Sequence, residues 1–197
     1  MFFSAHLVTV SRVAGALPRI GAVARGVGLC LLLALGGPLA AAEVSKEDQL
    51  KAAFLYNFTK FVEWPATCFS ADTSPIVLGV LGRNPFGGEL EKIVAGRTVN
   101  GRPLVVKLVT KPEEVAATHL LFVPTGEESR VPAAAWRQAE IVTVGESEAF
   151  AALGATITFV PAGDKVRFEI NIAAATRARV KISAQLQKLA TAVRHQP

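Results

Sequence analysis

Cysteine is almost absent from this chain of 197 residues, which contains only Cys30 and Cys68. Cys30 falls in a stretch that has the pattern of an N-terminal leader, so a processed chain would keep one thiol and could form no internal disulfide. Two interpretations of Cys68 stay open: a buried, unreactive side chain, or a disulfide to a partner or to a second copy. The frequent burial of free cysteine favours the first.

Catalytic and metal-binding patterns are also lacking. After the leader the only histidines are His119 and His195, and neither has a Cys, His or carboxylate at metal-ligand spacing. The sequence contains no G-x-S-x-G and no H-E-x-x-H. Residues 82–89, GRNPFGGE, follow an apolar run but lack the Lys-Ser or Lys-Thr of a P-loop. We expect a structural turn there, with a weak anion site at Arg83 as the alternative, and predict no enzyme, metal site or cofactor.

Acidic residues are missing from the first 42 positions, which predict a secretory signal peptide. This stretch combines three arginines, a short apolar run over residues 27–35 and small residues at 40–42. The apolar run is shorter than the roughly 20 residues that span a bilayer, which argues against a membrane anchor. No Arg-Arg pair is present, so the general secretory route is expected, with cleavage after Ala42. The predicted organisation is a leader, 1–42, and one exported domain, 43–197.

The basic character of the chain belongs partly to this leader. The whole chain carries a net charge of +5, from 21 Lys and Arg against 16 Asp and Glu. The leader holds three of the basic residues and none of the acidic ones, so the exported part has 18 against 16, a net charge of +2. It contains no block of basic residues, and nucleic-acid binding is therefore not indicated.

What the exported part does contain is an alternation of apolar strands and helical segments. We expect a helix over about 46–62, which Pro65 ends, and further helical segments at about 84–95, 112–118, 131–139, 147–153, 171–178 and 182–193. Strands are predicted at 76–82, 103–109, 119–124 and 140–145, and the stretch 155–171 predicts a β-hairpin. The pattern predicts a single α/β domain with a mostly parallel or mixed sheet, flanked by helices, and a C-terminal β-hairpin followed by helices.

Two features of this pattern are candidates for binding a partner. In the second strand of the hairpin, Arg167, Glu169 and Asn171 share one face opposite an apolar face, so they are exposed either to solvent alone or to a ligand or partner. There Arg167 could hold a carboxylate by a bidentate contact. The first helix concentrates aromatic residues: its spacing predicts a core face of Leu50, Phe54, Phe58 and Phe61. Tyr56 and Trp64 lie off that face and are the predicted contacts.

Three blocks in this order resemble the YfiR family: residues 51–65, KAAFLYNFTKFVEWP; residues 80–106, VLGRNPFGGELEKIVAGRTVNGRPLVV; and residues 165–190, KVRFEINIAAATRARVKISAQLQKLA. The resemblance extends over residues 47–190. It implies a non-catalytic periplasmic protein that binds the periplasmic sensory domain of an inner-membrane diguanylate cyclase and holds the cyclase inactive. Release would raise cyclic di-GMP, which promotes biofilm formation and reduces motility.

The chain departs from this family in its cysteines. Members are associated with redox and envelope stress partly through disulfides, and an intramolecular disulfide switch cannot operate with Cys68 alone. A different class of function stays open, a periplasmic module that binds a small molecule near the terminal hairpin. A homodimer, formed through Cys68 or an exposed strand edge, also stays open.

Overall fold

The computed structural model describes residues 43–130, 132–137, 140–163 and 165–195. The predicted signal peptide, residues 1–42, lies outside the described residues. None of the helices in the described part is long and apolar enough to cross a bilayer.

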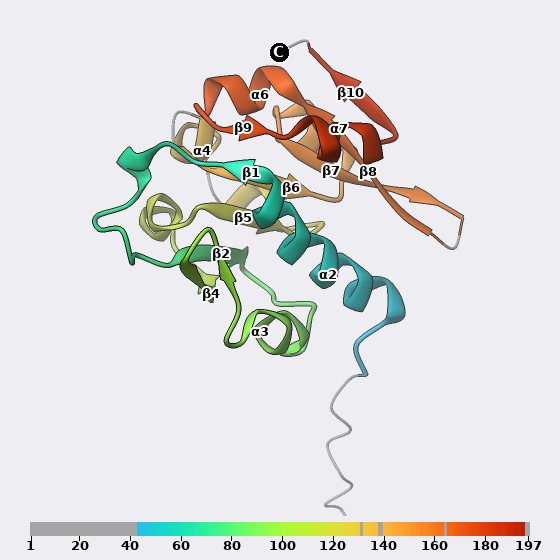
Figure 1. Ribbon diagram of the computed structural model, residues 1–197. Coiled ribbons are helices and arrows are strands. Elements are labelled where there is room, and N and C mark those ends of the chain that lie inside the picture. Colours follow the sequence, from blue (N-terminus) through green and yellow to red (C-terminus); the bar gives the residue numbers. More distant parts are fainter. Residues whose placement is uncertain (1–42, 131, 138–139, 164, 196–197) are drawn as a thin grey trace, which may run out of the picture. The chain divides into compact units, whose positions relative to one another are not determined.

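Helices in the described part are short apart from the first (Figure 1). They are α2 (Lys46–Phe61), α3 (Glu89–Val94), α4 (Ala134–Arg137), α5 (Glu148–Ala152), α6 (Ile172–Arg177) and α7 (Ala184–Leu189), with 3-10 turns η1 (Ala66–Cys68), η2 (Pro112–Ala117) and η3 (Glu128–Arg130). The strands are β1 (Val62–Glu63), β2 (Ile76–Leu81), β3 (Thr98–Val99), β4 (Arg102–Val109), β5 (Leu120–Val123), β6 (Val142–Gly145), β7 (Ile157–Ala162), β8 (Lys165–Asn171), β9 (Lys181–Ile182) and β10 (Ala192–Arg194).

Eight of the described strands form one mixed sheet in the order β10-β8-β7-β6-β5-β2-β4-β3. The five strands from β4 to β7 in this order are parallel to one another, whereas β8 and β3 pair antiparallel with β7 and β4. The remaining strands, β1 and β9, pair with each other. The predicted α/β domain with a mostly parallel sheet and a C-terminal hairpin is therefore confirmed.

The sheet is covered on both faces. On one face α2, α3 and α7 pack over the larger core, to which Leu55, Leu90 and Leu186 contribute. On the other face η2, α4 and α5 pack over a smaller core that contains Val115, Trp136 and Phe150. The connection from β2 to β4, which contains α3, thus passes over the face with the larger core. The later connections, which contain η2, α4 and α5, pass over the face with the smaller core. The chain reverses its direction of winding at β2, as in doubly wound folds.

Two predicted helices have different ends in the structure. The helix expected from residue 84 begins only at Glu89, because the Asn84 side chain accepts a hydrogen bond from Phe86 N (2.9 Å) and forms a turn. Gly88, with φ of 90°, then precedes the helix in a left-handed conformation that favours glycine. The helix expected over 182–193 ends at Leu189, and residues 192–194 pair with β8 as strand β10.

The buried face of α2 is wider than the predicted one and differs from it at one residue. Phe58 is buried, and Phe54 and Phe61 are partly buried against the larger core, as expected, but Leu50 is 42% exposed. The buried residues of the helix are Lys51, Ala52, Leu55, Phe58 and Thr59. Because α3 and α7 contact α2 as well as the sheet below it, the helix is enclosed over a wider sector than one apolar stripe.

Candidate functional site

The β7–β8 hairpin projects beyond the rest of the sheet (Figure 1). Only Ile157 and Thr158 of β7 pair with β6, and only residues 169–171 of β8 pair with β10. The pairing between β7 and β8 continues outward to Ala162 and Lys165. The outer half of the hairpin therefore has no strand beside it within the described part of the chain, and both of its faces can meet another molecule.

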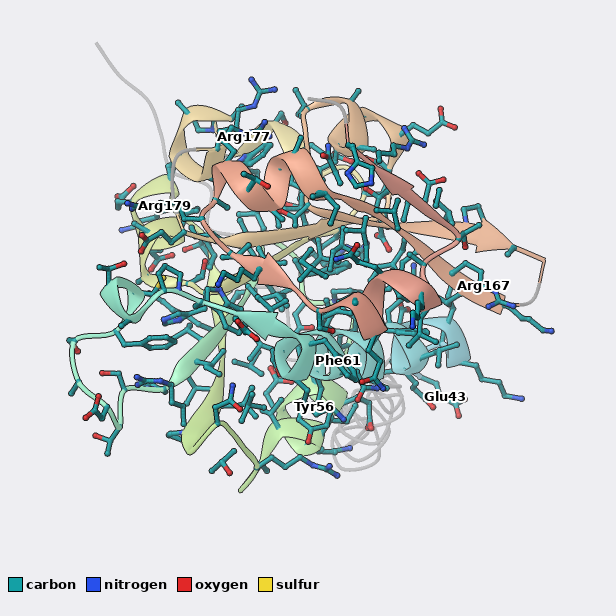
Figure 2. The ribbon with its side chains drawn as sticks, turned by 45° about the horizontal axis from the view of Figure 1, so that its top comes forward. Glu43, Tyr56, Phe61, Arg167, Arg177 and Arg179 are labelled. Atoms are coloured by element: carbon teal, nitrogen blue, oxygen red, sulfur yellow. The ribbon has the colours of Figure 1, made fainter. Side chains whose placement is uncertain are left out.

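The two faces of β8 differ as the alternation predicts. Phe168 and Ile170 are buried in the larger core, whereas Lys165 and Arg167 are exposed. Arg167 extends away from the hairpin in Figure 2. It forms no ion pair with any carboxylate that the structure describes. Its guanidinium is thus available to an acidic group.

A groove of about 830 Å³ adjoins the polar face of the hairpin and is lined by residues of α5, β7, β8 and β10. Glu169 and Asn171 lie in its wall. Glu169 is ion-paired with Arg194 of β10 at 2.5 Å. The Asn171 side chain accepts a hydrogen bond from Ala174 N (3.0 Å) and caps α6, so it also has a structural role.

Tyr56 and Trp64, the two aromatic residues predicted as contacts, lie away from this face. Tyr56 is separated from Arg167 in Figure 2, and its ring faces the cations of Lys60 and Arg97 at 4.7 Å and 4.9 Å. Trp64 donates a hydrogen bond from Nε1 to the carbonyl of His119 (3.0 Å). The structure therefore brings together the three hairpin residues but places Tyr56 and Trp64 at other positions.

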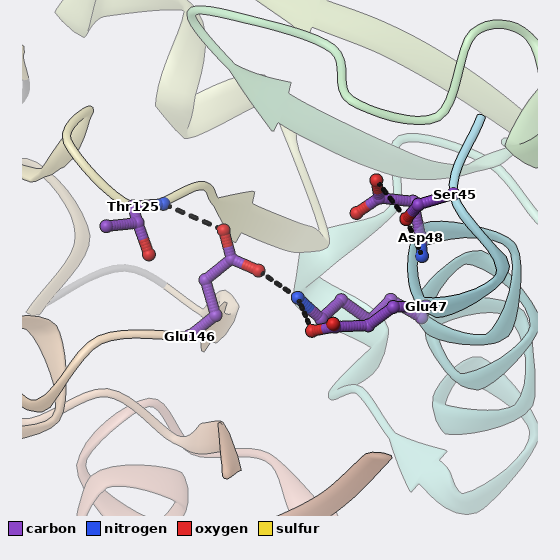
Figure 3. A network of polar contacts seen from close by, with 6 residues as sticks. Ser45, Glu47, Asp48, Thr125 and Glu146 are labelled. Carbon is purple, nitrogen blue, oxygen red and sulfur yellow. Dashed lines mark hydrogen bonds and ion pairs between the residues drawn. The ribbon is translucent and has the colours of Figure 1, made fainter. Parts of the chain in front are cut away.

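A buried ion-pair network, which the sequence did not indicate, joins α2 to the carboxyl ends of the central strands (Figure 3). The Lys51 ammonium lies 2.6 Å from a Glu146 carboxylate oxygen and 2.7 Å from one of Glu47. Glu146 also accepts a hydrogen bond from Thr125 N (2.9 Å) in the loop after β5. Burial lowers the pKa of Lys51, but the hydrogen bonds that its ammonium donates to the two glutamates, together with their negative charges, outweigh this effect, so the pKa lies above its usual value.

The network borders a second groove, of about 430 Å³, on the apolar side of the hairpin. Its walls are the N-terminal half of α2, the loop after β5, the residue after β6 and the outer half of the β7–β8 hairpin. In parallel α/β sheets, ligands bind outside the carboxyl ends of the strands, which is where Thr125 and Glu146 lie. A Lys and a Glu that are 95 residues apart give no sequence signal for such a site.

The crevice next to β2, where the winding reverses, is filled by side chains. Gly82 has φ of 64°, and an added Cβ there would collide with the Glu127 carboxylate. Glu127 is ion-paired with Arg130. The glycine-rich stretch therefore forms a turn that accommodates this ion pair, in agreement with the structural interpretation of residues 82–89.

Cys68 donates a hydrogen bond from its thiol to Glu140 Oε2 at 3.0 Å. Burial, together with this contact, raises the pKa of the thiol to about 12, so the reactive thiolate is strongly disfavoured. The same hydrogen bond, with the ion pair to Arg179 at 2.5 Å, lowers the pKa of Glu140. In the described part of the chain Cys68 is a free thiol, and no group of His, Cys, Asp and Glu has the arrangement of a metal site.

Comparison with known proteins places these features in context. A family model described as YfiR/HmsC-like matches residues 48–191. A crystal structure of a conserved domain protein from Vibrio cholerae O1 biovar El Tor strain N16961 aligns over 75% of this chain, with 12% identity and a TM-score of 0.47. The chain covers 60% of that protein's length. A comparison with curated protein sequences finds no significant match.

Proposed function

Because the chain belongs to the YfiR/HmsC-like family, we propose that it represses an inner-membrane diguanylate cyclase by binding the cyclase's periplasmic sensory domain. Membership of this family implies a regulatory, non-catalytic periplasmic protein of cyclic di-GMP signalling. The finer part of the proposal concerns the partner and the surface. We assign the surface to the polar face of the β7–β8 hairpin, with Arg167 and Glu169 as its main contacts.

The observation that carries this assignment is the exposed guanidinium of Arg167, which forms no ion pair with another described residue and lies on a hairpin that projects from the sheet. Arginine is among the residues that contribute most to binding at interfaces, and a bidentate contact to a carboxylate gives it both strength and direction. The adjoining groove, with Glu169 and Arg194 in its wall, supplies neighbouring charges of both signs. These features favour a partner surface that presents an acidic residue opposite Arg167.

An interface of ordinary size is sufficient for repression. A ligand that shifts a two-state protein from mostly active to mostly inactive must prefer the inactive state by roughly 5 kcal/mol. An interface of about 800 Å² per partner can provide this preference if a few contacts differ between the two states. The repressor then needs no chemistry of its own; it needs only to bind the inactive sensory domain more tightly.

Co-purification from native membranes tests the proposal. The exported protein would carry a tag after Pro197 on a long Gly/Ser linker, which keeps the tag clear of the groove beside β10. We expect one inner-membrane diguanylate cyclase to be recovered after gentle solubilisation, and less of it with Arg167→Ala. Arg83→Ala is the matched control, since Arg83 is also exposed and without an ion pair in the described part. Recovery of no membrane cyclase would refute the proposed partner, and equal recovery with both variants would refute the proposed surface.

A further inference from the structure

The turn between β3 and β4 has a reactive sequence that the proposed function does not use. Asn100 and Gly101 form a two-residue loop between the paired residues Val99 and Arg102. Their φ angles are 51° and 79°, so both residues have the left-handed conformation found in type I′ turns, for which Asn-Gly is a preferred sequence. Both residues are exposed to solvent. The turn lies at the β3 end of the sheet order, and β10 stands at the other end.

An asparagine that precedes a glycine can lose its side-chain amide without an enzyme. The backbone nitrogen of the glycine attacks the side-chain carbonyl carbon, and the new N–C bond closes a succinimide ring. The amide nitrogen takes up the proton that the backbone nitrogen gives up, and it leaves as ammonia. Water then opens the ring at either carbonyl carbon and yields aspartate or isoaspartate. Glycine permits the attack because it has no side chain to crowd its backbone nitrogen.

The attacking group is available at Asn100. The N–H of Gly101 donates no hydrogen bond to any backbone carbonyl in the described part of the chain, so no such bond has to break before it reacts. The β3–β4 ribbon is also short, because β3 has only two residues, and the backbone hydrogen bond just beyond it, from Leu104 N to Arg97 O, is long at 3.3 Å. A short ribbon at the edge of a sheet opens locally at low cost. Asn100 can therefore rotate into the geometry of attack while the rest of the domain stays folded.

The three other asparagines of the chain are in protected positions. Asn84 precedes Pro85, whose backbone nitrogen carries no proton to give up. Asn57 lies in the middle of α2, where the helix holds its backbone, and Asn171 accepts the hydrogen bond that caps α6 (3.0 Å). Asn57 and Asn171 both precede bulky residues. The structure thus separates Asn100 from the remaining asparagines by sequence, exposure and backbone support.

We propose that Asn100 is a site of spontaneous deamidation, so that the exported protein converts with age into a form with aspartate or isoaspartate in the β3–β4 turn. Either product adds one negative charge, so the exported part then has 18 basic residues against 17 acidic ones. Isoaspartate also carries the main chain through its side-chain carbon, which lengthens the loop between Val99 and Arg102 and loosens β3 from β4. The modified fraction therefore reports the age of the molecule.

Mass spectrometry of the exported protein, purified from the periplasm and incubated at pH 8.5 and 37 °C, tests this proposal. Trypsin releases residues 98–107, TVNGRPLVVK, because Arg102 precedes a proline, and the only side-chain amide in this peptide is that of Asn100. We expect the peptide to gain about one mass unit progressively, with isoaspartate among the products. The peptides that contain Asn57, Asn84 and Asn171 should keep their masses. A sample digested before incubation corrects for deamidation during the digestion.

Two variants test the chemistry of the step. Asn100→Ser removes the amide, and the mass of its peptide should stay constant during incubation. Gly101→Ala should slow the reaction about tenfold or more, because the added methyl group crowds the attacking nitrogen. A Cβ at this position meets no atom within 4 Å, so the variant should fold, and circular dichroism verifies this for both variants.

Incubation of the unmodified protein in urea gives the rate of deamidation in the unfolded chain. A native rate more than about a hundredfold below that rate would overturn the proposal, because the folded turn would then protect Asn100. Equal deamidation at the other asparagines, or an unchanged rate in Gly101→Ala, would overturn it as well. None of these results depends on whether a cyclase is the partner, because the measured quantity is the mass of a peptide.

Discussion

The buried contact between Lys51 and Glu146 should be a main determinant of how firmly α2 is held against the sheet (Figure 3). The Lys51 side chain is only 10% exposed and the Glu146 side chain only 15%. We predict that Lys51→Met destabilises the protein markedly. Methionine fills a similar volume, so the change removes the charge and leaves the Glu146 carboxylate buried with the hydrogen bond from Thr125 N as its remaining described contact.

Removal of one partner from a fully buried ion pair costs about 3–5 kcal/mol. Because Glu146 retains some exposure and one hydrogen bond, we expect about 2–3 kcal/mol for Lys51→Met, which corresponds to a decrease in Tm of about 5–10 °C for a domain of this size. Glu146→Gln should cost less, about 1–2 kcal/mol, because Lys51 keeps its contact with Glu47. The double variant should lose less than the sum of the two, since they share one interaction.

Urea unfolding followed by circular dichroism measures these free energies of unfolding. Lys92→Met is the matched control: Lys92 also forms an ion pair with a glutamate on its own helix, but its side chain is 71% exposed. Exposed pairs of this kind contribute little, so the control should change stability by less than about 0.5 kcal/mol. If Lys51→Met were as harmless as Lys92→Met, or if the two single variants were strictly additive in the double variant, the network would not hold α2 in place.

Two further predictions concern the cluster around Cys68. With a pKa of about 12, its thiol should react with iodoacetamide at pH 8 about a thousandfold more slowly than an unperturbed cysteine. Glu140→Gln should speed the reaction. A rate near that of free cysteine for the unmodified protein would contradict the structure. Burial also lowers the pKa of His119, whose Nδ1 accepts a hydrogen bond from Val77 N (3.1 Å). Stability should therefore be complete above the ordinary His pKa of about 6.5 and fall as the pH decreases below it. The His119→Asn variant should lose less stability between pH 7.5 and 5.5 than the unmodified protein, as measured by urea unfolding. Equal losses in the two proteins would contradict this assignment.

The sequence predicted the sheet better than the helices. Each of the central strands is a continuous apolar run, which is typical of strands buried on both faces, and the alternation along residues 165–171 correctly separated the two faces of the hairpin. Very short strands such as β9 and β10 were not predicted. They are fixed by pairing with β1 and β8, which are distant in the sequence, rather than by a local pattern.

The core face of α2 shows where local pattern fails. Periodicity favoured Leu50 as a core residue, but Leu50 is 42% exposed, and the pattern gave no indication that the neighbouring Lys51 is buried. A lysine can be buried here because two glutamates neutralise it, one of them contributed by the segment after β6. For the site, the sequence identified the polar hairpin face, whereas the groove on the apolar side depends on α2 and the hairpin lying opposite each other.

The most direct test of the proposed repression is the level of intracellular cyclic di-GMP in a strain that lacks its own copy of this gene and expresses variants of it. The unmodified protein should keep cyclic di-GMP low. Arg167→Ala and Glu169→Ala should both raise it several-fold while they remain folded and exported in normal amounts, and Arg83→Ala should behave as the unmodified protein does. Cyclic di-GMP that stays low with both hairpin variants would contradict the account, because the polar face of the hairpin would then have no part in repression.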